Sequence, residues 1–326
     1  MQLIHYSGPV PNFGDDLNAL VWPALAPHLF EEEDDERGFV GIGTILGMAG
    51  HTHRKLEIMS SGAGYDPIGN WADRHISFHC VRGPVTTHVL GLDPSVAITD
   101  GAILCPLVPA LPKRRGEGRS IAVIPHFQTL AFPGWKEACD AAGMVLIDPR
   151  LPPETVIHAI VDANLVLTES LHGAIIADTY GIPWSAFATS GNFCMPKWID
   201  WTASVGVELG VTYVPPPSGD PLEIFGRPRR QFGLRASFSL EDACAEMQAH
   251  VRSHAPKIGF GRVTHWAKAG AKALGLKRLS RAYSGLNSSR TAEALYRLSQ
   301  SEGMISKASH RDRLTDRLAS ALHAIA

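Results

Sequence analysis

The segment Leu165-Val-Leu-Thr-Glu-Ser-Leu-His-Gly-Ala-Ile-Ile-Ala177 contains a buried strand, a polar turn and then an apolar helix that begins near Leu171. The same order, a short apolar run followed by a helical pattern, recurs along the chain. The runs span residues 3–6, 40–46, 56–60, 76–81, 121–124, 144–147, 165–167 and 184–187. Because strands that alternate with helices form parallel sheets covered by helices on both faces, the sequence predicts an α/β protein.

The length of 326 residues suggests about two domains. Between the first four strand runs and the last four, residues 109–119 contain proline, glycine and charge without periodicity, which is typical of a linker. After a helix predicted around residues 240–252, the chain ends in a tail with helical periodicity. We therefore predict one domain over residues 1–112, a second over 119–256 and a basic helical tail over 257–326.

The composition is typical of a soluble cytosolic protein. Apolar residues make up 45% and charged residues 19% of the chain, and the mean hydropathy is near zero. The N-terminus lacks the basic and apolar parts of a signal peptide, and no apolar run approaches the roughly 18 residues of a membrane span. The five cysteines are scattered, with no C-x-x-C and no histidine at zinc-ligand spacing. We therefore expect reduced thiols and no metal site.

In open parallel sheets, ligands bind beyond the carboxyl ends of the strands, so the loops after the predicted strands are candidate sites. The first of them, Asn12-Phe-Gly-Asp-Asp-Leu17, opens a helix at about Asp16, and either Asp15 or Asp16 could simply cap that helix. Glycine-rich loops at residues 41–47 and 60–65 would let a ligand approach the backbone closely. Neither loop has the G-x-G-x-x-G spacing or a Walker lysine, which argues against a dinucleotide or P-loop site.

Two further loops carry basic residues. Arg82 ends a predicted strand beside the free N–H groups of the next helix, which forms an anion site; the alternative is a structural ion pair. His172 lies in the first turn of a helix at the carboxyl end of a strand, flanked by Glu169, Ser170 and Gly173. A lone histidine is more often structural, and both interpretations stay open for His172.

Five segments, taken in order, resemble the polysaccharide pyruvyl transferase family over roughly residues 10–190. They are N-F-G-D-D-L from Asn12, G-I-G-T from Gly41, V-R-G-P-V-T from Val81, D-G-A-I-L from Asp100 and S-L-H-G-A-I-I-A from Ser170. The resemblance implies two Rossmann-like domains that face each other across a cleft, as in GT-B glycosyltransferases. It also implies that phosphoenolpyruvate is the donor substrate, with no separate cofactor.

One departure from the family matters for the site. Many members have Arg-Leu-His where this chain has Ser170-Leu171-His172. Other residues must therefore bind the anion that this arginine binds in those members. The candidates are Arg82, His126 after the run at 121–124, and Lys197.

Ketal formation from phosphoenolpyruvate requires an acid that protonates the methylene carbon of the donor and a base that deprotonates a sugar hydroxyl. It also requires cations that bind the carboxylate and phosphate of the donor. We expect His172 to be the acid, a role worth ~10² to 10⁴ in rate, and we expect substrate binding to raise its pKa. Asp15 is the expected base, with Glu169 second. The expected substrate-binding residues are Arg82, Lys197, His126, Ser170, Gly173 and Asn12. Cationic side chains alone can drive phosphate loss, so we expect no metal requirement.

The two ends of the chain differ in charge. From Lys257 onward there are thirteen Lys or Arg residues against four Asp or Glu residues, so this tail carries +9 and residues 1–256 carry −11. The tail is either a solvated helical surface or a docking face for anionic lipid, where lipid-linked acceptor sugars reside. The docking residues would be Trp266, Lys268, Lys272, Leu274, Leu276, Lys277 and Arg278.

We therefore expect a cytoplasmic protein, peripheral at the inner face of the plasma membrane. Its expected partners are phosphoenolpyruvate and a sugar or lipid-linked oligosaccharide, and do not include nucleic acid.

Two other functions stay open. A GT-B-like glycosyltransferase would bind a nucleotide sugar but not phosphoenolpyruvate, and a non-catalytic partner in polysaccharide assembly would fold and associate with membranes without releasing phosphate.

Overall fold

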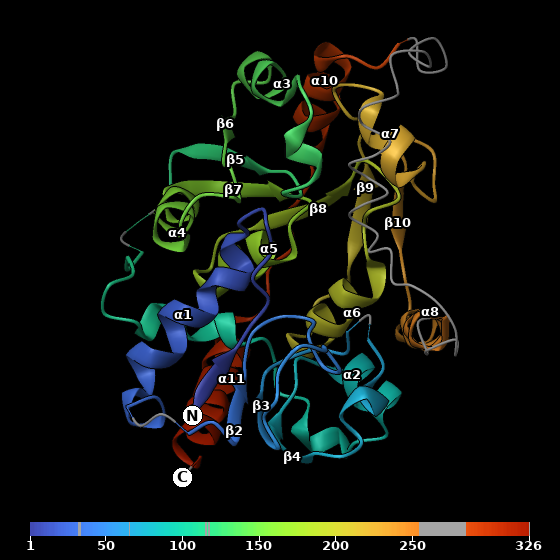
Figure 1. Ribbon diagram of the computed structural model, residues 1–326. Coiled ribbons are helices and arrows are strands. Elements are labelled where there is room, and N and C mark those ends of the chain that lie inside the picture. Colours follow the sequence, from blue (N-terminus) through green and yellow to red (C-terminus); the bar gives the residue numbers. More distant parts are fainter. Residues whose placement is uncertain (32–33, 65, 115, 117, 254–284, 326) are drawn as a thin grey trace.

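The computed structural model describes residues 1–31, 34–64, 66–114, 116, 118–253 and 285–325. The fold is α/β, with one sheet of four strands and a second of six (Figure 1). All neighbouring strands but one pair are parallel. The predicted fold class, with two Rossmann-like sheets, is therefore confirmed.

The first sheet runs in chain order, β1-β2-β3-β4, and all its strands are parallel. Its strands are β1 Gln2–Ile4, β2 Arg37–Val40, β3 Lys55–Met59 and β4 His75–Cys80. The helices of this half are α1 Phe13–Leu25 and α2 Pro84–Leu90, with 3-10 turns η1 Pro27–Leu29, η2 Ile68–Trp71, η3 Pro94–Val96 and η4 Gly101–Leu107. The strand predicted over residues 40–46 is wrong beyond Val40. The chain turns there at Gly43, whose φ of +131° is open to glycine but rarely to other residues.

The second sheet has the order β10-β9-β8-β7-β5-β6. Its strands are β5 Ser120–Ile124, β6 Val145–Leu146, β7 Ala163–Thr168, β8 Trp184–Ala188, β9 Gly210–Tyr213 and β10 Arg235–Ser237. Its helices are α3 Trp135–Ala141, α4 Pro153–Val161, α5 Leu171–Thr179, α6 Met195–Ser204, α7 Asp220–Phe225 and α8 Leu240–Ser253, with the 3-10 turn η5 Thr129–Ala131. The sequence did not predict β9 or the antiparallel β10, because neither contains a continuous apolar run.

Helix α5 connects the two halves of the molecule. Its residues 173–178 are all buried, and a helix that is apolar on every side must be enclosed by other elements. It packs against β7, β8 and α4 of the second half and against α1 and η4 of the first. The start of α5 therefore lies between the two sheets (Figure 1).

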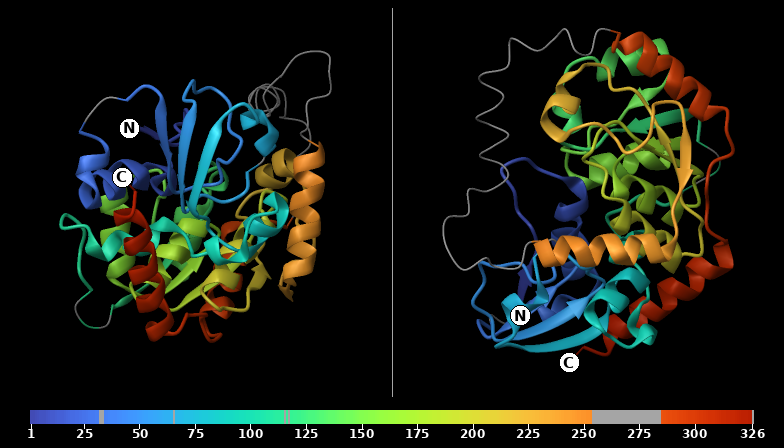
Figure 2. Two further views of the ribbon diagram at one scale, coloured as in Figure 1. Left: turned by 90° about the horizontal axis from the view of Figure 1, so that it is seen from below. Right: turned by 90° about the vertical axis from the view of Figure 1, so that its right-hand side faces the viewer.

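The end of the chain contacts both sheets. Helix α10 (Ser288–Ser299) packs against α3, and Met304 forms an antiparallel bridge with Trp184 of β8. Helix α11 (Ala308–His323) then returns to η4 and β4 and buries Leu314, Leu318 and Leu322. Figure 2 shows these two helices, in red, running along one side of the molecule from one sheet to the other.

The predicted tail is helical over most of its described part. The residues predicted to dock on a membrane, 266–278, lie outside the described residues. In the ranges that the structure does describe, no helix has both the length and the apolar character needed to span a bilayer.

Candidate active site

The first turn of α5 holds His172 at the carboxyl end of β7. The Thr168 hydroxyl accepts a hydrogen bond from the Ser170 N–H at 2.9 Å. Ser170 is the N-cap of α5, and its hydroxyl accepts from the Gly173 N–H at 3.4 Å. A Cβ at Gly173 would lie 2.6 Å from Thr168 Oγ1, so this turn has no room for a larger residue. Ser170 and Gly173, both predicted to bind substrate, therefore shape the turn that carries His172.

His172 lies between charged groups from both halves of the molecule. Its side chain is 11% exposed, and its Nε2 lies 3.8 Å from Asp100 Oδ2. Burial lowers the pKa of His172; the carboxylates of Asp100 and Asp15 oppose this effect, and the cations Arg82 and Lys197 add to it. The imidazole is therefore mainly neutral at neutral pH when no substrate is bound.

Helix α1 brings Asp15 to the same place. The helix begins at Phe13 with Asn12 as its N-cap, so the prediction that Asp15 or Asp16 caps a helix beginning near Asp16 is wrong. Asn12 makes no side-chain capping bond, and its Nδ2 donates instead to Asp15 Oδ2 at 2.8 Å. This bond orients the carboxylate, whose Oδ1 lies 3.9 Å from the Cβ position of Gly43 in the first glycine-rich loop.

Asn18, which the sequence analysis missed, holds that glycine-rich loop against α1. It is fully buried. Its Nδ2 donates to the Ile42 carbonyl at 2.8 Å, and its Oδ1 accepts from the Ile42 N–H and from Trp22 Nε1, both at 2.8 Å. The sequence feature that could have identified Asn18 is its position one helical turn before Trp22, on the apolar face of α1.

Arg82 is 1% exposed and forms an ion pair with Asp200 of α6, with 3.0 Å between Nε and Oδ2. Its Nη1 donates to Thr44 Oγ1 at 2.9 Å. The structural ion pair considered as an alternative is therefore present. However, Arg82 Nη2 is buried without a hydrogen-bond partner. A Cβ at Gly62 would lie 2.2 Å from Nη2, so the absence of a side chain at Gly62 is what makes room for the guanidinium.

Glu169 connects the loops that follow three strands of the second sheet. Its Oε1 accepts from the N–H and the hydroxyl of Thr189, both at 2.8 Å. Its Oε2 accepts from the Thr129 hydroxyl at 2.7 Å and from the backbone N–H of His126 at 3.2 Å. Burial raises the pKa of Glu169, and these hydrogen bonds oppose the rise. In this structure the carboxylate therefore positions the loops after β5, β7 and β8.

His126 and Lys197 lie on the second-sheet side of His172. His126 Nδ1 accepts from Asn192 Nδ2 at 3.0 Å and from the Gln128 N–H at 3.3 Å, so the ring proton belongs on Nε2. Burial lowers the pKa of His126 to about 3, and Lys197 adds to this effect. The ring can therefore offer an anion a hydrogen bond but no charge. Burial also lowers the pKa of Lys197, the third residue of α6.

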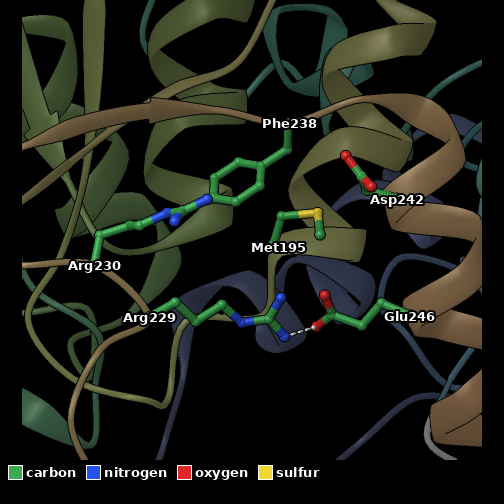
Figure 3. A pocket seen from close by; sticks show the side chains of 6 residues that line it. All are labelled: Met195, Arg229, Arg230, Phe238, Asp242 and Glu246. Carbon is green, nitrogen blue, oxygen red and sulfur yellow. Dashed lines mark ion pairs between the residues drawn. The ribbon is translucent and has the colours of Figure 1, made fainter.

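An open pocket next to α6 is lined by none of the predicted site residues (Figure 3). Its lining residues are Met195, Arg229, Arg230, Phe238, Asp242 and Glu246. Arg229 Nη2 pairs with Glu246 Oε1 at 2.6 Å. Met195 is the first residue of α6, so the pocket adjoins the helix that carries Lys197. The signal for these arginines was the run Arg-Pro-Arg-Arg at residues 227–230, to which the sequence analysis gave no role.

The structure thus gathers His172, Asp15, Arg82 and Lys197 where the two halves meet, and adds Asp100, which had no predicted role. The cations can bind a small anion, and an imidazole that is mainly unprotonated but lies beside carboxylates can take up and transfer a proton. No group of three or more His, Cys, Asp or Glu side chains that could hold a metal ion occurs within the part of the chain that the structure describes.

Comparison with known proteins gives two matches. A family model described as polysaccharide pyruvyl transferase matches residues 58–191, a range that includes Arg82, Asp100 and His172 but neither Asp15 nor Lys197. The succinoglycan biosynthesis protein ExoV of Rhizobium meliloti (strain 1021) is 37% identical over 210 residues. That match covers 63% of this chain and 63% of the relative, so the chain spans less than two thirds of the relative's length.

No solved structure matches the chain. The range matched by the family model contains three of the five motifs, those that begin at Val81, Asp100 and Ser170. The chain is therefore similar to the polysaccharide pyruvyl transferase family over residues 58–191 and to the succinoglycan biosynthesis protein over 210 residues.

Proposed function

We propose that this protein is an enzyme of exopolysaccharide biosynthesis that transfers pyruvate from phosphoenolpyruvate to a sugar as a ketal and releases phosphate. The match of residues 58–191 to the polysaccharide pyruvyl transferase model and the similarity to a succinoglycan biosynthesis protein support the proposal. The observation that carries it is the convergence of four groups between the two halves: His172, Asp15, Arg82 and Lys197. They supply the acid, the base and the two cations that the reaction requires.

In the proposed reaction, His172 protonates the methylene carbon of phosphoenolpyruvate, and the neighbouring carbon becomes cationic. Asp15 accepts the proton of the first sugar hydroxyl as its oxygen attacks that carbon. The carbon–oxygen bond to phosphate breaks, and the phosphate leaves with the proton from Asp15. The second hydroxyl closes the ketal and returns a proton to His172. Glu169 is the second choice as base, because both its oxygens already accept hydrogen bonds.

Arg82 Nη2 and Lys197 hold the carboxylate and phosphate of the donor. His126 adds a neutral N–H donor, Asn12 orients Asp15, and Ser170 and Gly173 present the first turn of α5. The negative charge of the donor favours the imidazolium and raises the pKa of His172 against the effect of burial. The acid therefore becomes protonated when the donor is bound.

The acceptor in this proposal is a lipid-linked oligosaccharide, and the protein works at the cytoplasmic face of the plasma membrane. The net charge of +9 over residues 257–326 supports contact of this segment with anionic lipid. Vesicles with and without anionic lipid would test this contact, because electrostatic binding should weaken as salt rises.

The direct test uses phosphoenolpyruvate and a crude fraction of lipid-linked oligosaccharides. Wild-type protein should release phosphate only when the acceptor is present. His172→Ala should lower that rate by about 10²-fold or more, while circular dichroism and thermal unfolding show that the variant folds. His88→Ala is the matched control, since His88 is an exposed histidine at the end of α2, and it should keep full activity.

Each other outcome has a definite meaning. Phosphate release that is unchanged in His172→Ala would keep the reaction but remove His172 as the acid. Binding of a nucleotide sugar without binding of phosphoenolpyruvate would replace the proposal with a glycosyltransferase. Binding of neither, with no phosphate release from any acceptor fraction, would favour a non-catalytic partner in polysaccharide assembly.

A further inference from the structure

The two carboxylate oxygens of Asp100 differ, because one accepts a hydrogen bond from the backbone and the other has no hydrogen-bond partner. The residue is fully buried at the start of η4. Its Oδ1 accepts a hydrogen bond from the Ala102 N–H at 3.0 Å and so caps the turn. Its Oδ2 is buried without a hydrogen-bond partner. Capping needs only one oxygen, so the cap does not explain a buried carboxylate.

The second oxygen faces His172. Asp100 Oδ2 lies 3.8 Å from His172 Nε2, and Nε2 is also buried without a hydrogen-bond partner. Two complementary groups that are both unsatisfied and point at each other are unusual in a folded protein, because each costs free energy when unpaired. An approach of about 1 Å would create a hydrogen bond of ordinary length. Asp100 follows the first sheet and His172 begins α5, so a small approach of the two halves would close this gap.

We propose that Asp100 is the positioning residue of His172: its carboxylate accepts a hydrogen bond from Nε2–H, holds the imidazole in place and stabilises the imidazolium. This role rests on the proposed function, in which His172 is the acid. With Nε2 directed at Asp100, the proton for the substrate is on Nδ1, the nitrogen that faces the start of α1 at Gly14. A carboxylate that fixes the tautomer and charge of a histidine is a recurring device in proton transfer.

The other charges around His172 show why such a carboxylate is needed. Burial disfavours the imidazolium, and Arg82 and Lys197, which the donor requires, disfavour it further. Asp15 and Asp100 act in the opposite direction. In the proposed reaction Asp15 takes up a proton and loses its charge, so Asp100 is the carboxylate that keeps its charge throughout the cycle.

The test variants remove the negative charge of Asp100 but keep a side-chain oxygen that can cap η4. Asp100→Asn retains an oxygen for the Ala102 N–H, and Asp100→Ser retains a capping hydroxyl. The pKa of His172 is measured by NMR of its imidazole signal, which is identified by its loss in His172→Gln. We expect that pKa to fall by roughly 1 to 3 in Asp100→Asn and Asp100→Ser. The activity that requires the protonated acid should then move to lower pH, with kcat reduced and the KM for phosphoenolpyruvate little changed.

Asp93→Asn is the matched control. Asp93 caps η3 through an Oδ1 that accepts from the Ser95 N–H at 2.8 Å, as Asp100 caps η4. It is exposed and is not among the groups that shift the pKa of His172. This variant should leave the pKa of His172 and the pH profile unchanged. An unchanged His172 pKa in a folded Asp100→Asn or Asp100→Ser variant would overturn the proposal.

The proposal stays testable if neither Asp100 variant folds. In wild-type protein with phosphoenolpyruvate bound, the Nε2–H proton of His172 should be protected from exchange with water. Rapid exchange of that proton would refute the hydrogen bond. If the pKa shift is seen but no acceptor releases phosphate, the Asp100–His172 pair stands and the proposed reaction fails, so the two ideas are tested separately.

Discussion

Gly14 determines how the His172 imidazole can lie against α1. A Cβ atom at this position would lie 2.0 Å from Nδ1 and 2.5 Å from Cγ of His172. Alanine is at least as favourable as glycine in a helix, so the backbone would tolerate the change. We expect Gly14→Ala to displace the imidazole and lower kcat by about 10²-fold, because small misplacements of catalytic groups are costly.

Activity assays and circular dichroism of Gly14→Ala would check this expectation. Gly69→Ala is the control, since a Cβ at Gly69 meets nothing within 4 Å, and it should leave both readouts unchanged. Equal activity of the two variants would mean that the ring does not need the space that Gly14 leaves.

Single residues could be predicted where chain order alone places them. His172 and Arg82 were identified because each follows a predicted strand, and both lie between the two halves. Their partners could not be identified in this way. Asp200 is 118 residues from Arg82, and Asp100 meets His172 only because α5 is buried between the halves. Such pairings depend on how the sheets are placed in space, which no local pattern encodes.

At the scale of elements, the ion pair between Arg82 and Asp200 joins the start of α2 to α6. Both side chains are 1% exposed. The Asp200 carboxylate also accepts from the Thr86 N–H at 2.9 Å and from the Thr86 hydroxyl at 2.7 Å. Asp200→Asn would leave the Arg82 charge buried without its counter-charge. We expect a loss of about 3–5 kcal/mol in the free energy of unfolding, measured by urea denaturation.

The control for this loss is Asp140→Asn, which removes an exposed ion pair with Lys136 within α3. Exposed pairs contribute little, so its unfolding midpoint should stay close to that of the wild type. If Asp200→Asn were no less stable than Asp140→Asn, the pair could not be what holds α2 and α6 together.

The existence of the main elements was predictable, and their ends were not. Eight apolar runs located eight strands because buried parallel strands need continuous apolar residues. The end of β2 was misplaced because Ile42 and Ile45 continue the apolar pattern while the backbone has already left the sheet. The start of α1 was misplaced because Asn12 occupies the N-cap position without a side-chain capping bond. Neither departure changes the periodicity of the sequence.

For the whole molecule, the chain end is the part that sequence patterns describe least well. Leu314, Leu318 and Leu322 recur at helical spacing, which predicts a helix with one buried face. The pattern does not say what covers that face, and in the structure η4 and β4 of the first half do so. The match to the family model ends at residue 191, so it does not reach this segment either.

Two partly buried histidines connect the stability of the whole molecule to pH. Burial lowers the pKa of His51, in the first half, to about 4, and Arg74 adds to this effect. Burial lowers the pKa of His126, in the second half, to about 3, with Lys197 adding to it. Both would titrate near 6.5 in the unfolded chain. Below pH 6.5 the unfolded chain therefore binds more protons than the folded one, and acid favours unfolding.

We expect the melting temperature to fall as the pH is lowered from about 6.5 to about 5, and these two groups to leave it constant between about pH 7 and pH 8. Each histidine contributes at most about 1.4 kcal/mol per pH unit in the acid range, and less where water screens its exposed part. Thermal unfolding of His126→Asn should show a flatter profile than the wild type, whereas His88→Asn, which changes an exposed histidine, should keep the wild-type slope. Equal slopes for the wild type and His126→Asn would mean that His126 takes up protons as freely in the folded protein as in the unfolded chain. The neutral ring assigned to His126 in donor binding would then have to be replaced by a charged one.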